Sequence, residues 1–258
     1  MKGTVIIDCF PESAERYLVD HAIVAIDVIR ATTTATTALS LGRRVLPACT
    51  TDEASVMAGA LVNPLLAGEV GGNTPYGFEM TNSPAHIAAR ADVERPMVLV
   101  SSSGTQLILT AAGSLGVYLA CLRNYTAVAA HLAGRHSRIA IIGAGTRGQF
   151  RREDQIGCAL VAAQLLEAGY AAQNQETLDC VARWTTVSPD ARAEAIRSGR
   201  SAEYLRRSGQ DHDLDFVLAH LDDLPTVPAL VAGELLDRPA QAVAGAGYES
   251  LPGAVRVE

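Results

Sequence analysis

Short runs of Val, Ile, Leu and Ala alternate over the first two thirds of the chain with stretches whose apolar residues recur at helical spacing. The runs are continuously apolar, which is typical of strands that are buried on both faces. Strands and helices that alternate in this way predict an α/β fold, with three α/β/α layers around a largely parallel sheet. The predicted strands cover residues 4–7, 22–26, 44–47, 64–67, 96–100, 116–120 and 138–142, and the predicted helices cover 33–41, 52–60, 84–91, 105–112, 126–133 and 153–168.

The pattern changes after Gly169. Residues 177–222 carry many charges and few clusters of Val and Ile, and they predict a helical segment. Residues 221–228 contain two prolines and predict a loop, after which 227–232 predict a last strand. Because we find neither a fixed-period repeat nor a low-complexity linker, we expect a single domain over residues 1–258 with a helical C-terminal third.

Composition and charge limit the kinds of partner. Apolar residues make up 48% of the chain, which is ample for a hydrophobic core. The formal net charge is -7, whereas a protein that binds nucleic acid or an anionic membrane would carry a basic surface. An anionic substrate must therefore be attracted locally, by a metal ion or by a few arginines.

Cysteine usage and the absence of long apolar segments indicate a cytoplasmic protein. The cysteines are odd in number and form no C-x-x-C pair, so we expect reduced, mostly buried thiols. The N-terminal residues lack the apolar run of a signal peptide, and no segment approaches the roughly 20 apolar residues of a membrane span. The sequence leaves the oligomeric state open, with a homo-oligomer as one alternative. The five cysteines are Cys9, Cys49, Cys121, Cys158 and Cys180.

The stretch from 27 to 34, Asp-Val-Ile-Arg-Ala-Thr-Thr-Thr, follows directly on a predicted strand. It places the Asp27 carboxylate at the end of that strand, Arg30 three residues later, and hydroxyls at a helix start. A carboxylate can hold a divalent cation, while arginine and a helix N-terminus can hold an oxyanion. This combination indicates phosphoryl chemistry. The alternative is a surface aspartate that caps the following helix.

Other polar residues also come directly after predicted strands. Ligands of parallel α/β sheets lie outside the carboxyl ends of the strands, so we expect these residues to share one rim with Asp27. Ser83 and Pro84 fit a helix cap and a first helical position. A serine nucleophile is disfavoured because the chain has no Gly-x-Ser-x-Gly elbow. The rim residues are Glu69, a metal candidate; Ser101 and Ser102; Ser103, Gly104 and Thr105, which could cradle an oxyanion; and the turn at 143–148.

Residues 143–148 match the G-x-G-x-x-G spacing of a dinucleotide turn, so a nicotinamide-dependent oxidoreductase is an alternative function. A dinucleotide turn would run straight into an apolar-faced helix, but residues 149–154 intervene here, and no acidic strand end follows at the expected distance. Glu153 and Asp154 open that helix, where acids complement the helix dipole, although such a pair also suits Mg²⁺. The acids at 211, 213 and 215 are typical of a solvated helix start. The six histidines are not spaced as a zinc set.

Together these stretches resemble the 2-phosphosulfolactate phosphatase (ComB-like) family. The matching pieces run in family order, and the first of them is the most specific. They are residues 27–34, Gly68-Glu69, Gly77-Phe78 with Asn82-Ser83-Pro84, Ser103-Gly104-Thr105, Asn124 before Ala127-Val128-Ala129, residues 143–148 with Glu153-Asp154, and Asp213 with Val227-Pro228.

The resemblance implies an α/β/α fold and a Mg²⁺-dependent phosphatase. The family hydrolyses (2R)-2-phospho-3-sulfolactate to 3-sulfolactate and phosphate on the route to coenzyme M. The resemblance leaves open which acids hold the metal and which acts as the base. By motif position, the catalytic residues would be Asp27, Arg30, Glu153 and Asp154; the metal ligands Asp27, Glu69, Glu153 and Asp154; and the substrate-binding residues Thr32, Thr33, Thr34, Asn82, Ser83, Ser103, Gly104, Thr105 and Gly145.

The chain departs from the family where the pattern Thr-Asn-Gly-Thr-Arg follows a strand. Here Ser102, Ser103, Gly104, Thr105 and Gln106 occupy those positions. Loss of the asparagine and the arginine removes an amide and a cation from the rim, so a second anionic group such as a sulfonate would have one fewer partner. The resemblance therefore supports the reaction more strongly than the substrate. A different phosphomonoester and a non-catalytic phosphometabolite-binding protein stay open as alternatives.

Overall fold

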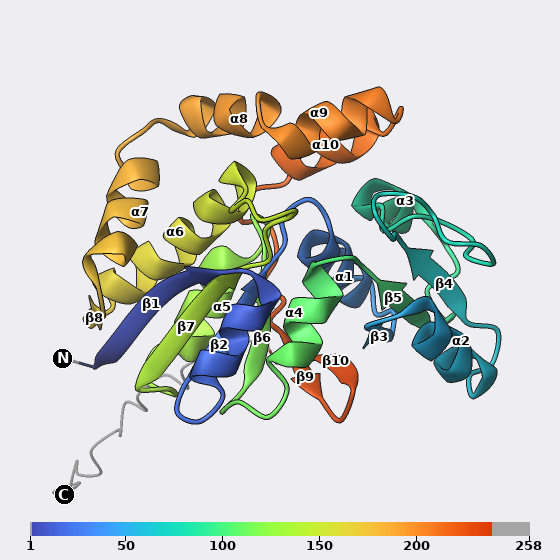
Figure 1. Cartoon of the computed structure of the whole chain (residues 1–258), viewed down its shortest axis with the longest axis horizontal. Coiled ribbons are helices and arrows are strands. Elements are labelled where there is room, and N and C mark those ends of the chain that lie inside the picture. The colour runs from blue at the N-terminus through green and yellow to red at the C-terminus, as the bar shows by residue number, and fades with distance from the viewer. Residues whose placement is uncertain (1, 239–258) are drawn as a thin grey trace, which may run out of the picture.

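A mixed ten-stranded sheet runs through the computed structural model of the chain, which describes residues 2–238 (Figure 1). Its strand order is β4-β5-β3-β10-β9-β6-β2-β7-β1-β8. The strands are β1 (Gly3–Cys9), β2 (Ala22–Ile26), β3 (Val45–Ala48), β4 (Leu65–Gly68), β5 (Met97–Val100), β6 (Val117–Ala120), β7 (Arg138–Gly143), β8 (Tyr170–Ala172), β9 (Pro228–Val231) and β10 (Glu234–Asp237).

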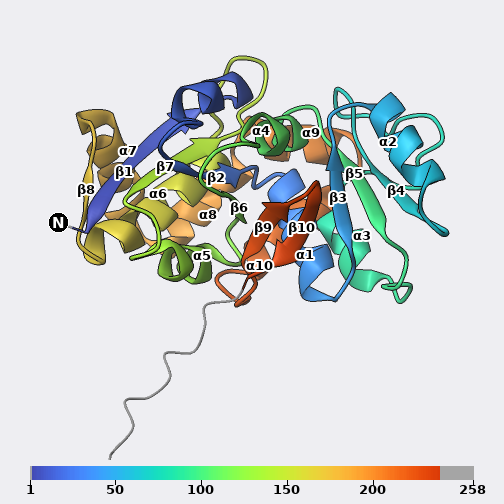
Figure 2. The same ribbon diagram turned by 90° about the horizontal axis from the view of Figure 1, so that it is seen from below.

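The sheet consists of two parallel groups that an antiparallel hairpin joins. β4, β5 and β3 form one group, and β6, β2, β7, β1 and β8 form the other. The hairpin β9–β10 lies between β6 and β3, as Figure 2 shows. It pairs with the two groups at Tyr118↔Ala229 and Leu235↔Val45. The largely parallel sheet that the sequence predicts is therefore confirmed.

Helices cover both faces of the sheet and form the outer layers of the α/β/α arrangement (Figure 1). A 3₁₀ helix, η1 (Pro11–Tyr17), precedes β2. The α-helices are α1 (Ala31–Ser40), α2 (Thr51–Gly59), α3 (Pro84–Ala89), α4 (Gly104–Thr110), α5 (Tyr125–Leu132), α6 (Arg152–Glu167), α7 (Gln175–Thr185), α8 (Pro189–Arg197), α9 (Arg200–Arg207) and α10 (Asp211–Ala219).

Alternate side chains of β2 enter two different cores, because successive residues of a strand point to opposite faces. Val24 and Ile26 pack into a core with α5 and α6, whereas Ile23 and Ala25 pack into a core with α1 and α4. All five residues of β2 are buried, so apolar side chains are required at every position of this strand. The burial of both faces explains why β2 was predictable as a continuous apolar run.

The structure confirms the predicted elements to within a few residues and adds several. The seven strands predicted in the first part of the chain are β1 to β7, and the expected strand at 227–232 is β9. The helical C-terminal third consists of α7 to α10. The sequence did not predict η1, β8 or β10. Of the single domain predicted over 1–258, residues 1 and 239–258 lie outside the described residues, and the prediction itself stays untested.

The C-terminal helices α8, α9 and α10 pass across one end of the sheet, above the loops that follow β2 and β7 (Figure 1). This placement encloses the rim where the sequence predicts the site. Among residues 2–238, no helix combines the length and the apolar character that crossing a membrane requires. The five thiols are free, and two of them, Cys121 and Cys158, are buried.

Candidate active site

A pocket of about 800 Å³ lies between the loops at the carboxyl ends of the strands and helix α9. It receives side chains from loops after β2, β4, β5 and β7, which the sequence predicted to share a rim. Its lining is Asp27, Ile29, Arg30, Glu69, Gly71, Gly72, Asn82, Ser101, Ser102, Ser103, Thr146, Arg147, Arg151, Arg200, Ser201, Glu203, Tyr204, Leu205 and Arg207.

Asp27 lines this pocket at the point where β2 ends and α1 is about to begin. The residue is only 7% exposed. Its nearest side-chain donor is the Ser101 hydroxyl, 3.5 Å from Oδ2. Burial, followed by the negative charge of Glu69, raises the pKa of Asp27 to about 7. The carboxyl group can therefore change its protonation state near neutral pH, as a general base or acid must.

Glu69 connects the loop after β4 to the loop after β5. Its carboxylate accepts hydrogen bonds from the Gly72 N–H at 2.6 Å, the Ser102 N–H at 2.7 Å and the Ser102 hydroxyl at 3.0 Å. Gly72 in turn accepts a hydrogen bond from the Tyr204 hydroxyl of α9. These bonds hold Glu69 at the pocket wall and attach α9 to the rim.

Gly104 provides the space that the Asp27 carboxylate occupies. A Cβ atom added at Gly104 would lie 2.3 Å from Asp27 Oδ2 and 2.5 Å from the Ala31 Cβ. Because the Ala31 methyl belongs to a packed helix, the short Asp27 side chain would have to move. Gly104 therefore acts on the site through Asp27, although it does not itself line the pocket.

We expect Gly104→Ala to lower kcat at least about 10-fold and to destabilise the fold by roughly 1–3 kcal/mol through overpacking. Phosphate release and chemical denaturation measure the two effects. Gly59→Ala is the matched control for a glycine replaced at a helix end, because Gly59 is the last residue of α2 and a Cβ there meets nothing within 4 Å. Full activity in Gly104→Ala would show that Asp27 tolerates displacement.

Asp154, a predicted metal ligand, lies outside the pocket lining. Its Oδ1 accepts a hydrogen bond from the Val28 N–H at 2.9 Å and its Oδ2 one from the Gly145 N–H at 3.1 Å. The side chain thus joins the loop after β2 to the loop after β7. Burial, together with the charges of Asp27 and Glu153, raises its pKa well above the ordinary value.

Glu153 also lies outside the lining, behind Ser201 of α9. Burial raises its pKa, an effect that the Ser201 hydroxyl opposes. Within residues 2–238, no three His, Cys, Asp or Glu side chains converge as a metal-binding group. Of the four carboxylates predicted as metal ligands, Asp27 and Glu69 line the pocket, and the metal-ligand roles of Glu153 and Asp154 stay predictions.

The hydroxyls of Thr32, Thr33 and Thr34 bond to the protein itself and do not line the pocket. Thr32 Oγ1 donates to the Asp27 carbonyl at 2.9 Å, and Thr33 Oγ1 donates to the Val28 carbonyl at 2.8 Å. Thr34 Oγ1 donates to the Asn82 carbonyl at 2.7 Å. All three therefore fix the path of the chain around Asp27, and their contact with phosphate stays a prediction that this geometry does not favour.

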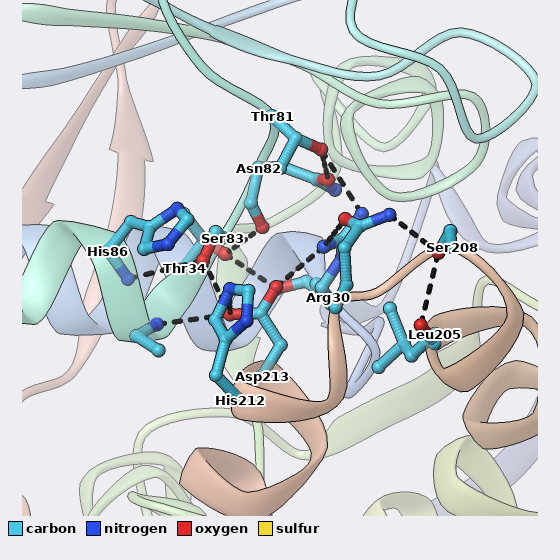
Figure 3. A network of polar contacts seen from close by, with 12 residues as sticks. Arg30, Thr34, Thr81, Asn82, Ser83, His86, Leu205, Ser208, His212 and Asp213 are labelled. Atoms are coloured by element: carbon cyan, nitrogen blue, oxygen red, sulfur yellow. Dashed lines mark hydrogen bonds and ion pairs between the residues drawn. The ribbon is translucent and has the colours of Figure 1, made fainter.

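Arg30 lines the pocket, but its guanidinium is held from behind by α10 (Figure 3). Nη1 lies 2.6 Å from Asp213 Oδ2 and 2.5 Å from the Gln210 amide oxygen, while Nη2 donates to Thr81 Oγ1 at 3.1 Å. The Arg30 side chain is 3% exposed and that of Asp213 is 0% exposed. Asp213 thus fixes the position of the Arg30 guanidinium at the pocket and offsets its charge.

Asp213 is a buried organising residue rather than part of a solvated helix start, which corrects the expectation from the sequence. Besides Arg30, it accepts hydrogen bonds from the Ser83 hydroxyl at 2.5 Å and the Ala85 N–H at 3.2 Å. His212 beside it stacks on His86 of α3, with ring centroids 4.4 Å apart (Figure 3). Asp213 therefore ties α10 both to α3 and to the start of α1.

The other predicted substrate-binding residues divide into two groups. Asn82 and Ser103 line the pocket. Ser83 lies outside it and caps α3, accepting the His86 N–H at 3.1 Å as expected. Thr105 and Gly145 also lie outside it. The Thr105 hydroxyl donates to the Ser101 carbonyl at 3.0 Å, and the Gly145 N–H is taken by Asp154.

Sequence reasoning missed most of the pocket's positive charge. Arg147 and Arg151 come from the loop after β7, and Arg200 and Arg207 come from α9. Gln106, which stands where the family pattern has arginine, donates to the Cys49 carbonyl and lies outside the lining. With Arg30, five arginines face a pocket in a chain whose net charge is -7. The pocket can therefore bind an anionic ligand by local charge.

The turn at 143–148 does not have the arrangement of a dinucleotide site. The Phe150 ring and Asp154 pack against Gly143, where an added Cβ would lie 2.3 Å from Phe150. The following helix begins with two acids, Glu153 and Asp154, which would repel a pyrophosphate. The nicotinamide alternative is therefore not supported.

Comparison with known proteins gives consistent matches over most of the chain. The family model for 2-phosphosulpholactate phosphatase matches residues 9–233. A probable 2-phosphosulfolactate phosphatase of Deinococcus radiodurans is 36% identical over 241 residues, 92% of this chain and 96% of the relative. Proteins of the same description from Synechococcus sp. (strain CC9605) and Symbiobacterium thermophilum are each 33% identical, covering 86% and 85% of this chain and 93% and 95% of the relatives.

Proposed function

Because the chain belongs to the 2-phosphosulpholactate phosphatase family and is thus a phosphoric monoester hydrolase, we propose that it hydrolyses (2R)-2-phospho-3-sulfolactate with the help of Mg²⁺. The products are 3-sulfolactate and phosphate. The observation that carries this proposal is the composition of the pocket, where the titratable Asp27 carboxyl and Glu69 lie among five arginines. A role in coenzyme M synthesis and a cytoplasmic location stay predictions.

The acidic side chains Asp27 and Glu69 of the pocket fit a magnesium ion that is held by few protein ligands. Asp27 is buried, and burial together with the negative charge of Glu69 raises its pKa to about 7, although the Arg30 charge opposes this shift. Glu69 offers a second carboxylate, and the hydroxyls of Ser101 and Ser102 are close to these two acids. Mg²⁺ characteristically uses one or two carboxylates together with water and substrate phosphate. Asp27 and Glu69 would therefore hold it.

When bound, the ion would offset the negative charge that develops on the phosphoryl oxygens. The chain's own residues provide the other functions. Arg30, oriented by Asp213, and the arginines of the wall attract the phosphate and stabilise its charge. The Asp27 oxygen that the ion leaves free would accept a proton from the attacking water as the new P–O bond forms and the ester P–O bond breaks. That proton can then pass to the departing alkoxide, which restores the Asp27 carboxylate.

A panel of phosphomonoesters tests the function. Purified protein is incubated with 2-phospho-3-sulfolactate, 2-phospholactate, phosphoserine and p-nitrophenyl phosphate, with and without Mg²⁺, and released phosphate is measured. We expect the highest kcat/KM with 2-phospho-3-sulfolactate. If no member of the panel releases phosphate under any condition, the proposal is wrong.

We expect removal of divalent cations with EDTA to lower phosphate release at least about 100-fold, and Mg²⁺ to restore it. Glu69→Gln should raise the Mg²⁺ concentration for half-maximal activity about 10-fold or more, because it removes one of the two carboxylate ligands. Glu79→Gln is the matched control, since Glu79 lies on the same loop but is exposed and paired with Arg95. Equal Mg²⁺ dependence in both variants would remove Glu69 from the metal site.

A further inference from the structure

Three arginines of the pocket have no carboxylate partner among the described residues. Arg147 and Arg200 make no side-chain ion pair or hydrogen bond there, and Arg151 donates only to the Gln149 amide oxygen, at 3.0 Å. Other arginines of the chain pair with acids within 4 Å, among them the remaining two of the pocket lining, Arg30 and Arg207. These paired residues are Arg16, Arg30, Arg43, Arg44, Arg90, Arg95, Arg123, Arg138 and Arg207.

Arg151 carries a second, independent sign of a missing ligand. Its Nε is buried and has no hydrogen-bond partner within residues 2–238. A buried N–H group is almost always satisfied in a folded protein, by the chain itself, by water or by a ligand. An anion between Arg151 and its neighbours would supply the acceptor. Guanidinium groups are suited to this, because they bind carboxylates and sulfonate-like oxyanions through paired N–H donors.

The three arginines come from two separate segments that line the same pocket. Arg147 and Arg151 flank the end of the loop after β7, while Arg200 is the first residue of α9. A smaller hollow of about 450 Å³ adjoins this pocket, and both Arg151 and Arg200 also line it. The guanidinium groups are therefore reachable from solvent. Asp27 and Glu69 belong to other segments of the lining, the loops after β2 and β4.

We propose that Arg147, Arg151 and Arg200 form a subsite for a second acidic group of the substrate, distinct from the phosphate. The inference rests on the proposed function and adds to it the residues that determine specificity. The subsite selects phosphomonoesters that carry a carboxylate or sulfonate near the phosphate. It also supplies the positive charge that is missing because Gln106 stands where the family pattern has arginine. Phosphomonoesters without a second acidic group, such as p-nitrophenyl phosphate, lack the group that these arginines bind.

The test compares substrates with and without the second acidic group. For Arg200→Gln, kcat/KM should fall about 30-fold with 2-phospho-3-sulfolactate and 2-phospholactate but less than about 3-fold with p-nitrophenyl phosphate. Arg206→Gln is the matched control, because Arg206 is exposed on the same helix and lies outside the pocket lining. An equal fall with all substrates, or none with any, would overturn the subsite.

A binding measurement separates failure of the subsite from failure of the proposed function. 3-Sulfolactate carries a carboxylate and a sulfonate but no phosphate, so its binding requires no turnover. Isothermal titration calorimetry should give a Kd at least about 10-fold weaker for Arg200→Gln and Arg151→Gln than for the unchanged protein and Arg206→Gln. Equal affinity in all four proteins, or no binding in any, contradicts the subsite whatever the panel of phosphomonoesters shows.

Discussion

Asp27→Asn should lower kcat for phosphate release by a factor of about 10³ or more while leaving the protein folded. The amide cannot accept the proton of the attacking water, and it is a weaker ligand for a divalent cation. No other acid of the described pocket lining can readily replace it, because Asp27 is the buried one among them. Measurement of kcat at saturating Mg²⁺ and substrate gives the size of the effect. Turnover within 10-fold of the unchanged protein would exclude Asp27 from the reaction.

The same substitution should stabilise the metal-free protein at alkaline pH. The pKa of Asp27 is about 7 in the folded state against 3.8 ordinarily, so between these values the folded protein binds a proton that the unfolded chain does not. The contribution of this bound proton to the free energy of unfolding is fully present below pH 4 and is lost as the pH rises through 7. The difference is on the order of 4 kcal/mol. Asparagine does not titrate. Urea denaturation in EDTA at pH 5 and pH 8 should therefore show the variant gaining stability relative to the unchanged protein as the pH rises.

Asp213→Ala should destabilise the fold by about 3–5 kcal/mol. Removal of this carboxylate leaves the Arg30 guanidinium buried without its counter-charge, and it also deprives Ser83 and the Ala85 N–H of their acceptor. Because Arg30 would no longer be held at the pocket, kcat should fall as well. Urea denaturation measures the free energy of unfolding, and released phosphate measures the activity of the fraction that stays folded.

Asp215→Ala is the control for this experiment. Asp215 lies two residues further along α10 and is exposed, so its loss should change the free energy of unfolding by no more than about 0.5 kcal/mol. The double variant with Arg30→Met should recover part of the loss, because it removes the uncompensated charge. If Asp213→Ala and Asp215→Ala are equally mild, the buried ion pair does not hold α10 to the site.

The sequence predicted those parts of the site that depend on local pattern. A five-residue apolar run identifies β2 because both of its faces are buried, and the position of Asp27 at its end follows directly. Glu69 and Ser103 were predictable for the same reason, since each follows a short buried strand. The resemblance to the phosphatase family was likewise carried by residues 27–34 and has been confirmed by the family match.

The remaining residues of the site depend on how distant segments pack. Asp213 alternates with other acids in a pattern typical of an exposed helix start, and only its contact with Arg30, 183 positions away in sequence, shows that it is buried. Arg200 and Arg206 look alike in the sequence of α9, yet only Arg200 lines the pocket. Asp154 was expected at a metal, but two N–H groups from separate loops use its oxygens. No local signal distinguishes these cases.

The hairpin β9–β10 has a consequence for how the protein is made. The hairpin lies between β3 and β6 and pairs with both. During translation β3 and β6 leave the ribosome long before the hairpin, so until then each has one edge without a hydrogen-bonded neighbour. Until then the nascent chain carries two incomplete half-sheets with exposed backbone donors and acceptors, which attract other chains. Synthesis of the hairpin satisfies both open sides in one late step, so the order of translation delays the completed sheet until nearly all of the described chain exists.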